Sequence, residues 1–393
     1  MFTKNILIAL GVCSVLSAQN FDTLLNKVLQ TSPYLKANSL EIERADEESR
    51  LIQRYKNPTL SLEVSEFTPD IGKSEAGYRV GLSQPVRLWG VSADREKMAY
   101  ATKEEAKGFI QLKRAEFIKV FSLLYNSYIT QTALVDLAKE EVAISKNIAL
   151  ISRQRYEAGT IAKVKYLRAK VDLAGSENLL DEKKAMQIAS YYKLMAFAGL
   201  QNEQELEAKY SFRLSNKKFK EAQKNSAELH YFQTKQNTSS AKAKLNTNKI
   251  EWMRLYGEYE VEPDQNIARV GVNIPLALFN TKKEEKKIAT LEAKQSEFLL
   301  QNQKIMLSNN LERLQKELAI LQSVMTSTHK LYDSQKELLK MYEDGYKIAN
   351  INLLELQNIK NQMIQTKAKE ISLQNKINKN IVIYNYEVGE YNE

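Results

Sequence analysis

The chain of 393 residues contains the same pattern twice, at an offset of 190 positions. Residues 78–89 align without a gap with residues 268–279, and the two segments share Arg, Val, Gly, Pro and a Leu at matching positions. A second pair of segments, 156–159 and 346–349, keeps the same offset, so the stretch between the two landmarks has the same length in both copies. One repeat of this size indicates a duplicated unit, because solenoid arrays repeat at roughly 20 to 50 residues.

The first 18 residues have the composition of a secretory signal peptide. Lys4 precedes an apolar run over residues 6–16, and small residues follow at 17–18, after which we expect cleavage. The apolar run is too short to span a membrane. The only cysteine, Cys13, lies in this segment, so we expect a mature chain without a thiol. We do not expect a lipid on Cys13, because Val12 is not the small residue that a lipid anchor requires.

Charge and hydropathy limit the partners of the chain. The 57 Lys and Arg residues are interspersed with 48 Asp and Glu residues, which is typical of solvated helix surfaces. After the leader no stretch of 18 apolar residues occurs, and the mean hydropathy is −0.45, so we do not expect an inner-membrane protein. Nucleic-acid binding is not expected either, because the sequence shows no basic cluster with base-reading motifs.

The sequence contains no pattern typical of an enzyme. Its two histidines, His230 and His329, have no second histidine at metal-ligand spacing, and no phosphate-binding glycine loop or nucleophile motif is present. We therefore expect no catalytic residues, no metal and no cofactor.

Each copy is expected to contain long, uninterrupted helices. None of the six prolines lies in residues 89–262 or 276–393, and a proline inside a helix costs about 3 kcal/mol. Apolar residues within 117–128 and 311–325 recur at steps of three and four, which is coiled-coil spacing.

The predicted helices form two antiparallel hairpins that are too long for a compact domain. A helix from about Ser92 to Tyr156 would be roughly 95 Å long. The chain then turns near Gly159 and returns as a second helix, and the second copy does the same near Ala349.

Two strand-like runs precede each hairpin. Residues 60–65 and 78–83 alternate between apolar and polar, as do 255–262 and 268–274. This pattern fits the strands of a transmembrane β-barrel, and it fits equally a soluble sheet with one buried face. Four strands cannot close a barrel, for which about eight are needed, so the sheet edges would need partner chains.

The remaining segments complete the predicted organisation. Residues 199–220 break the helical periodicity and predict a linker or a small lateral element. We expect a helix over about 226–252 to lead into the second strand pair, as residues 21–55 lead into the first. The predicted units are a signal peptide (1–18), a first repeat (19–198), the linker (199–220) and a second repeat (221–393).

These features together resemble the TolC family of outer-membrane efflux proteins. The signal peptide, the duplicated unit, the turn segment 155–159 and the Gly-x-x-x-Pro strand ends at Gly81/Pro85 and Gly271/Pro275 carry the resemblance, which covers essentially the whole mature chain. The resemblance implies a mainly α fold with a transmembrane β part. Three chains would form a homotrimer with one 12-stranded β-barrel and a periplasmic α-barrel.

The resemblance also implies that the hairpin turns form a periplasmic tip, where the channel narrows. The family motif there is an aromatic residue, a Gly three positions on, and an acid six positions after that. In the second copy Tyr346 and Glu355 match, Ala349 replaces the Gly, and Asn358 stands where a second acid is common. Three Glu355 carboxylates would form a ring at the constriction. Alternatively, Glu355 only begins the returning helix, where the helix dipole favours an acid by about 0.3–1 kcal/mol.

The first copy departs from the motif at the acid. Tyr156 and Gly159 match, but Lys165 occupies the acidic position. We expect Lys165 to pair with an acid on a neighbouring hairpin and to help hold the tip shut. Because Ala349 replaces a glycine, a positive φ there would cost on the order of 1 kcal/mol, so we expect the second turn to be more helical than the first.

Aromatic residues mark the ends of the second strand in each copy. Trp89 and Phe279 stand at matching positions, where membrane barrels carry aromatic belts. Alternatively, Trp89 packs inside the strand-to-helix junction.

The function that follows from the resemblance is the outer-membrane exit duct of a tripartite efflux system in a Gram-negative bacterium. Its expected partners are a periplasmic adaptor protein, an inner-membrane pump of the resistance-nodulation-division class and outer-membrane lipid, and its expected cargo is heavy-metal ions or drugs. The alternative is a periplasmic coiled-coil adaptor or structural rod. An adaptor would carry one hairpin between glycine-rich β domains, whereas this chain has two predicted hairpins and 13 glycines.

Overall fold

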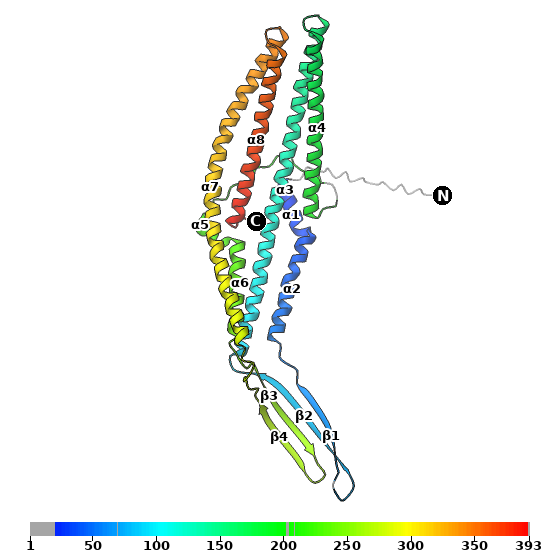
Figure 1. The fold of residues 1–393 in the computed structure, drawn as a ribbon, viewed down its shortest axis with the longest axis vertical. Helices are drawn as coiled ribbons and strands as arrows, with labels where there is room; N and C mark the ends of the chain where they lie inside the picture. The colour runs from blue at the N-terminus through cyan, green and yellow to red at the C-terminus, as the bar shows by residue number, and fades with distance from the viewer. Residues whose placement is uncertain (1–19, 69, 202–203, 208, 392–393) are drawn as a thin grey trace, which may run out of the picture.

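The computed structural model describes residues 20–68, 70–201, 204–207 and 209–391. The predicted signal peptide, with Cys13, lies outside these residues. The molecule is elongated, with helices along most of its length and a small sheet at one end (Figure 1).

The two predicted hairpins are confirmed. The first consists of α3 (Val91–Glu157) and α4 (Lys163–Ala198), and the second of α7 (Lys283–Lys347) and α8 (Leu353–Glu387). With 67 residues, α3 is about 100 Å long. Within the described part of the chain, no helix is both long and apolar enough to cross a membrane.

Shorter helices precede each strand pair. The segment predicted as one helix from residue 21 to 55 is divided into α1 (Phe21–Thr31) and α2 (Pro33–Gln53), because Pro33 favours the first position of a helix and cannot continue one. In the second copy, α5 (Phe219–Asn225) and α6 (Ala227–Leu245) take this place.

The predicted helix over 226–252 is too long. Helix α6 ends at Leu245, and Trp252 is the first residue of β3. The side-chain amide of Asn248 donates to the Leu245 carbonyl (3.1 Å) and to Asp94 (2.9 Å), so it stabilises a turn at the point where a continued helix was expected.

The four strands form one antiparallel sheet in the order β1-β2-β3-β4. Their bounds are β1 (Thr59–Phe67), β2 (Glu75–Arg87), β3 (Trp252–Val261) and β4 (Asn266–Asn273). β1 runs away from the helices and β4 runs back toward them (Figure 1). Each outer strand has one edge to which no other strand of the described residues pairs.

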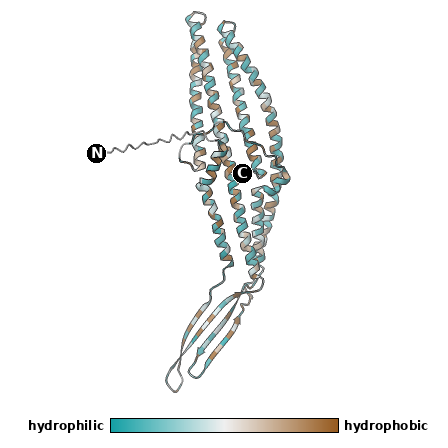
Figure 2. Ribbon diagram, turned by 180° about the vertical axis from the view of Figure 1, so that it is seen from behind, coloured by the Kyte–Doolittle hydropathy of each residue, from teal (hydrophilic) through white to brown (hydrophobic). Residues whose placement is uncertain are grey.

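The register gives the sheet two different faces. One, the apolar face, carries Leu60, Leu62, Val64, Tyr78, Val80, Leu82, Tyr259, Val270 and Val272; the other, the polar face, carries Ser61, Glu63, Arg79, Glu258, Glu260 and Arg269. Figure 2 shows this alternation as bands of colour along the strands. No part of the described chain covers the apolar face, where Val270 is 92% exposed. This differs from a soluble sheet, which buries such a face.

The largest apolar core lies midway along the helices. Phe21, Phe121, Tyr125 and Leu194 are fully buried there, and the rings of Tyr210 and Phe212 pack on Phe21 at 4.6 and 5.2 Å between centroids. The predicted linker therefore packs against α1 and α3. The exact boundaries of the predicted units stay a prediction.

Candidate functional site: the hairpin tip and the strand-to-helix junction

The two hairpin turns have the same backbone. In the first, Gly159 N–H donates to Tyr156 O (2.9 Å) and Thr160 N–H to Arg155 O (2.8 Å); in the second, Ala349 and Asn350 make the corresponding bonds to Tyr346 and Gly345 (3.3 and 2.9 Å). Each turn spans five residues between its helices. This is the left-handed C-cap that normally takes glycine.

Ala349 adopts the conformation that glycine adopts in the first copy. Its φ is +70°, close to the +73° of Gly159. The prediction that the second turn is more helical is therefore wrong, and the chain accepts the cost of a left-handed alanine, on the order of 1 kcal/mol. The turn keeps the same two backbone hydrogen bonds as in the first copy, so the connection between α7 and α8 forms despite this local cost.

The returning helices begin differently in the two copies. Asn352 caps α8 by accepting a hydrogen bond from Glu355 N–H (3.0 Å), and its amide donates to the Glu355 carboxylate (2.8 Å). In α4 the equivalent cap is Ala162, which makes no side-chain bond. Lys165 and Asn358 are both exposed, and no ion pair of Lys165 is found within the described residues. Glu355 thus stabilises the start of α8, and its carboxylate remains exposed at the tip.

The matching tyrosines have different surroundings. Tyr156 is exposed and stacks on Tyr166 with ring centroids 5.7 Å apart. Tyr346 is buried between the hairpins. Its hydroxyl bonds with the Ser152 hydroxyl (2.8 Å), and Arg155 lies over its ring and donates to its carbonyl (2.7 Å). The Tyr346 contacts therefore join the second turn to the first hairpin.

A buried lysine joins the hairpins two turns further from the tip. Lys360 of α8 is 1% exposed, and its ammonium donates to Asp172 of α4 (2.7 Å) and to Ser145 of α3 (3.0 Å). Glu141 of α3 lies 3.9 Å away. Burial raises the pKa of Glu141, although Lys360 partly opposes the shift. If α8 moved away from α3 and α4, Lys360 and Asp172 would each lose an oppositely charged partner, so this contact strongly favours the packed arrangement.

Sequence reasoning missed Lys360. The apolar positions of α8 include Leu353, Leu356 and Met363, and Lys360 lies four residues after Leu356 on the same helical face. A charged residue on an apolar stripe was the available signal. Its partners Asp172 and Ser145 lie roughly 190 and 215 positions away, so no local pattern identifies them.

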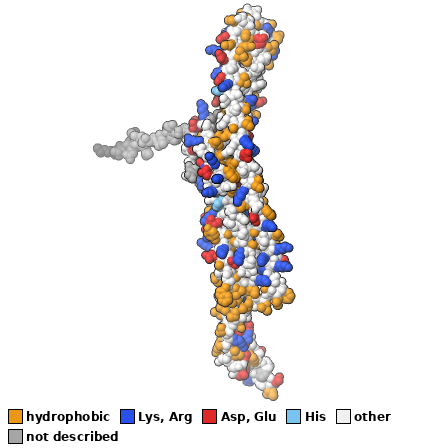
Figure 3. Space-filling model, turned by 90° about the vertical axis from the view of Figure 1, so that its left-hand side faces the viewer, with side chains coloured by type: hydrophobic (Ala, Val, Ile, Leu, Met, Phe, Trp, Pro, Cys, Tyr) orange, Lys and Arg blue, Asp and Glu red, His pale blue; other side chains and the backbone are white. Residues whose placement is uncertain are grey.

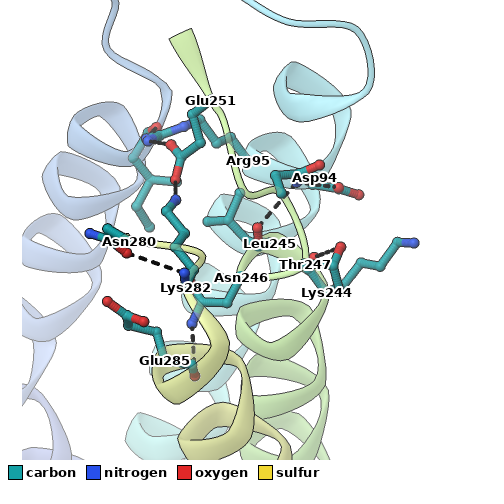
Figure 4. Close-up of polar contacts among 12 residues, drawn as sticks. Asp94, Arg95, Lys244, Leu245, Asn246, Thr247, Glu251, Asn280, Lys282 and Glu285 are labelled. Atoms are coloured by element: carbon teal, nitrogen blue, oxygen red, sulfur yellow. Dashed lines mark hydrogen bonds and ion pairs between the residues drawn. The ribbon is translucent and has the colours of Figure 1, made fainter. Parts of the chain in front are cut away.

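At the other end of the helices, a single carboxylate links the start of β3 to α3 and to the segment before α7 (Figure 4). Glu251, just before β3, forms ion pairs with Arg95 of α3 and with Lys282, which precedes α7. Arg95 also donates to the Ile52 carbonyl at the end of α2 (2.7 Å). The Glu251 cluster therefore fixes how the sheet meets the helices.

Aromatic and cationic side chains continue this junction on the polar side of the sheet. Trp252 lies directly opposite Arg87 in the β2–β3 register. The Arg87 guanidinium lies 4.2 Å from the Tyr55 ring centroid and 5.1 Å from that of Trp252, within cation–π range. The Arg87 side chain also donates to the Arg54 carbonyl (2.8 Å). None of these residues was singled out from the sequence.

The predicted junction residues fall at separate places. Gly81 and Gly271 lie within β2 and β4 on the polar face, and the Tyr256 ring covers Gly271 so closely that a Cβ would lie 2.5 Å from it. Pro85 is in β2 beyond the last residue that pairs with β1, and Pro275 follows β4. The two glycines therefore lie inside the strands and the two prolines nearer the helices, so these residues do not form one site.

Trp89 and Phe279 lie at the junction and are 96% and 99% exposed. Trp89 therefore does not pack inside the junction formed by the described residues. Leu276 and Leu278 are also exposed there, and Figure 3 shows hydrophobic side chains gathered where the helices meet the sheet. The second copy has two more residues at this point, because α7 begins 192 positions after α3.

The comparisons with known proteins agree with this architecture. The profile of the outer membrane efflux protein family matches residues 24–200. No curated protein sequence matches the chain.

Several solved structures share the fold over nearly the whole chain. The outer-membrane channel OprN is 13% identical with a TM-score of 0.80, covering 94% of this chain and 90% of that one. VceC from Vibrio cholerae is 12% identical with a TM-score of 0.79, covering 94% and 95%. The outer membrane channel CmeC from Campylobacter jejuni is 13% identical with a TM-score of 0.76, covering 93% and 86%. The family profile matches residues 24–200 and the channel fold extends over nearly all of the chain, so the protein is similar to the outer membrane efflux protein family.

Proposed function

We propose that three copies of this chain form the exit duct of a tripartite efflux system in the outer membrane of a Gram-negative bacterium. The observation that carries the proposal is the sheet: its apolar face is uncovered, its opposite face is charged, and both of its edges are free. β4 of one copy and β1 of the next run in opposite directions, so they can pair as antiparallel neighbours. Three four-stranded sheets then close into a 12-stranded barrel with its apolar faces toward lipid.

The exposed aromatic residues support the same orientation. Trp89 and Phe279 lie at the level where such a barrel would leave the membrane, and aromatic rings are favoured at that interface. The helices would continue the duct through the periplasm and place the hairpin turns at its far end. A monomeric rod or an adaptor gives no reason for an uncovered apolar sheet face.

The chain performs no chemical step in this function. The duct conducts when the hairpins separate at the tip, and a partner opens it only by binding the open state more tightly than the closed one. A periplasmic adaptor along the hairpins and an inner-membrane pump of the resistance-nodulation-division class are the partners we propose, with drugs or heavy-metal ions as cargo. Support for this pump class and cargo comes from the tip sequence that contains Glu355.

At the tip we propose a ring of three Glu355 carboxylates, one from each copy. Their exposure at the start of α8 leaves them free to face a common axis. Asn358, on the next turn, adds no charge to the ring. Lys165 would pair with an acid of a neighbouring hairpin and hold the tip shut. If Lys165→Glu leaves the basal conductance unchanged, this role of Lys165 is wrong.

The proposal is tested on protein extracted from outer membranes with detergent. We expect light scattering to give the mass of a trimer and planar bilayers to show a small conductance. A detergent-free monomer without conductance would contradict the proposed duct and would favour the periplasmic rod.

A further inference from the structure

A row of alternating charges crosses all four strands on the polar face. Arg79 donates to Glu63 (3.0 Å) and to Glu260 (2.6 Å), and Glu260 also pairs with Arg269. The row therefore begins with an acid on the free edge strand β1 and ends with a base on the free edge strand β4.

Burial along the row distinguishes its middle from its ends. The Glu260 side chain is 9% exposed, whereas Glu63 at one end is 61% and Arg269 at the other is 39% exposed. Glu260 has two guanidinium partners and Glu63 has one. Glu63 and Arg269, at the two ends of the row, can therefore each form one more ion pair, and their charges are opposite.

We infer that Arg269 on β4 of one copy pairs with Glu63 on β1 of the next, and that this pair sets the register in which the copies join. The inference rests on the proposed trimeric barrel. It assigns the contact between β4 of one copy and β1 of the next, called the seam below, to two side chains. The row of charges then forms a closed ring around the inside of the barrel.

The shape of the sheet fits this register. At the end remote from the helices, Val64 of β1 is level with Asn266, the first residue of β4, but β1 continues for three more residues to Phe67. For the rim of the barrel to have an even height, residues at equal height on neighbouring strands must be shifted by about one residue relative to those that pair directly across the sheet. At roughly 3.3 Å per residue and 4.8 Å between strands, that displacement corresponds to a strand tilt of about 35°, which is typical of membrane barrels.

The row of charges follows the same displacement. Glu63, Arg79 and Glu260 lie directly opposite one another on β1, β2 and β3. On β4 the residue opposite Glu260 is Ile267, but the ion pair of Glu260 is with Arg269, two residues nearer the helices. A second shift of about two residues, between β4 of one copy and β1 of the next, brings the total shift of the row to about four residues over four strands. The row then reaches Glu63 of the next copy at its starting height. In that register Arg269 faces Ser65 of the neighbour, and Glu63 is its diagonal neighbour, within reach of long side chains.

Disulfide crosslinking tests the register directly. The chain has one cysteine, Cys13, in the predicted signal peptide, so introduced cysteines would be the only thiols of the mature protein. The inferred register places Asn273 opposite Ser61 of the neighbouring copy. Within one copy these two strands are separated by two others, or at least about 14 Å, which is too far for a disulfide. We expect Ser61→Cys with Asn273→Cys to give covalent trimers on oxidation in the membrane.

A second pair of cysteines detects a slipped seam. A slip must be by two residues, because a slip by one would turn the charged face toward lipid. Thr59→Cys with Asn273→Cys reports such a slip, and we expect little crosslinking from it in the otherwise unchanged chain. Adding Arg269→Gln should raise its crosslinked fraction relative to the Ser61 pair by roughly fivefold, the size of effect expected for a partly exposed ion pair. Glu66→Gln on β1, which removes a charge outside the row, is the control, and it should leave the ratio unchanged.

The possible outcomes distinguish a failure of the inferred register from a failure of the proposed barrel. Trimers with an unchanged crosslinking ratio in the Arg269→Gln variant would overturn the role of the ion pair and leave the exit duct intact. Efficient crosslinking of the Thr59 pair in the unchanged chain would overturn the inferred register. A monomer in which neither pair crosslinks would contradict the barrel itself, and with it this inference.

Discussion

At the scale of single residues, Ala349 and Gly159 offer a matched pair of substitutions. Both have a positive φ in the same turn, and no atom would contact a Cβ at Gly159 within 4 Å. Ala349→Gly should therefore raise the free energy of unfolding by about 0.5–1 kcal/mol, and Gly159→Ala should lower it by about 1 kcal/mol. Thermal unfolding of both variants measures this. Shifts of the same sign in both would show that the strain lies elsewhere.

Lys360 is the residue at which a single change should weaken the contact between the hairpins most. Replacing it with methionine keeps its length but leaves the partly buried Asp172 without a cation, with only the Ser145 hydroxyl (3.3 Å) still donating to it, so we expect a loss of about 2–4 kcal/mol. Lys347→Met is the control, because an ion pair as exposed as Lys347–Asp344 contributes little to stability. Thermal unfolding compares the two. If Lys360→Met costs no more than the control, the lysine does not hold the hairpins together.

The residue scale is also where sequence reasoning was weakest. Tyr156 and Tyr346 occupy equivalent positions, yet one is exposed and the other is buried against Ser152 and Arg155. Only the second faces the other hairpin. A duplicated sequence gives two similar units, but it does not say which surfaces they bury against each other, and the Glu251 cluster was missed for the same reason.

At the scale of elements, the end of α8 should make stability depend on pH. Glu387 is buried beside Glu228, and its burial raises the pKa of the carboxyl to about 6, with Lys119 and Arg313 partly opposing the shift. Asn310 donates to the carboxylate (3.3 Å). Because the folded state binds this proton more tightly, the stabilisation is complete below the usual pKa of about 4.5 and is lost as pH rises through about 6. At pH 7.5 the charged group then costs about 2 kcal/mol.

Glu387→Gln should therefore be more stable than the unchanged protein at pH 7.5, and the difference should vanish near pH 4.5. Glu390→Gln is a control of opposite sign, because a hydrogen bond from Lys217 lowers the pKa of Glu390, and that stabilisation is present at neutral pH and lost on acidification. Melting temperatures across this pH range decide the matter. A Glu387→Gln variant that is less stable at pH 7.5 would contradict the prediction.

The elements themselves were largely predictable, and the exceptions have local causes. Long proline-free stretches and apolar spacing predicted both hairpins, and alternation predicted all four strands. The end of α6 was misplaced because the turn depends on Asn248 bonding to Asp94 of another helix. The conformation of Ala349 was misjudged because the turn keeps the backbone hydrogen bonds of the first copy despite a local cost of the same order as one hydrogen bond.

At the scale of the whole molecule, the two interpretations of Glu355 predict different measurements. If three Glu355 carboxylates form a ring at the tip, Glu355→Gln removes up to three negative charges from the constriction and should reduce the preference for cations in planar bilayers. If Glu355 only stabilises the start of α8, the same change leaves ion selectivity unaltered and lowers stability by about 0.3–1 kcal/mol.

Glu337→Gln is the matched control for this measurement, because Glu337 is an exposed carboxylate on α7 away from the tip. It should change neither property. The reversal potential in a salt gradient, measured beside the melting temperature, distinguishes the interpretations in one set of samples. A shifted reversal potential in Glu355→Gln alone would place its carboxylate in the path of the ions. An unshifted potential with a lowered melting temperature would limit Glu355 to the cap that it forms with Asn352.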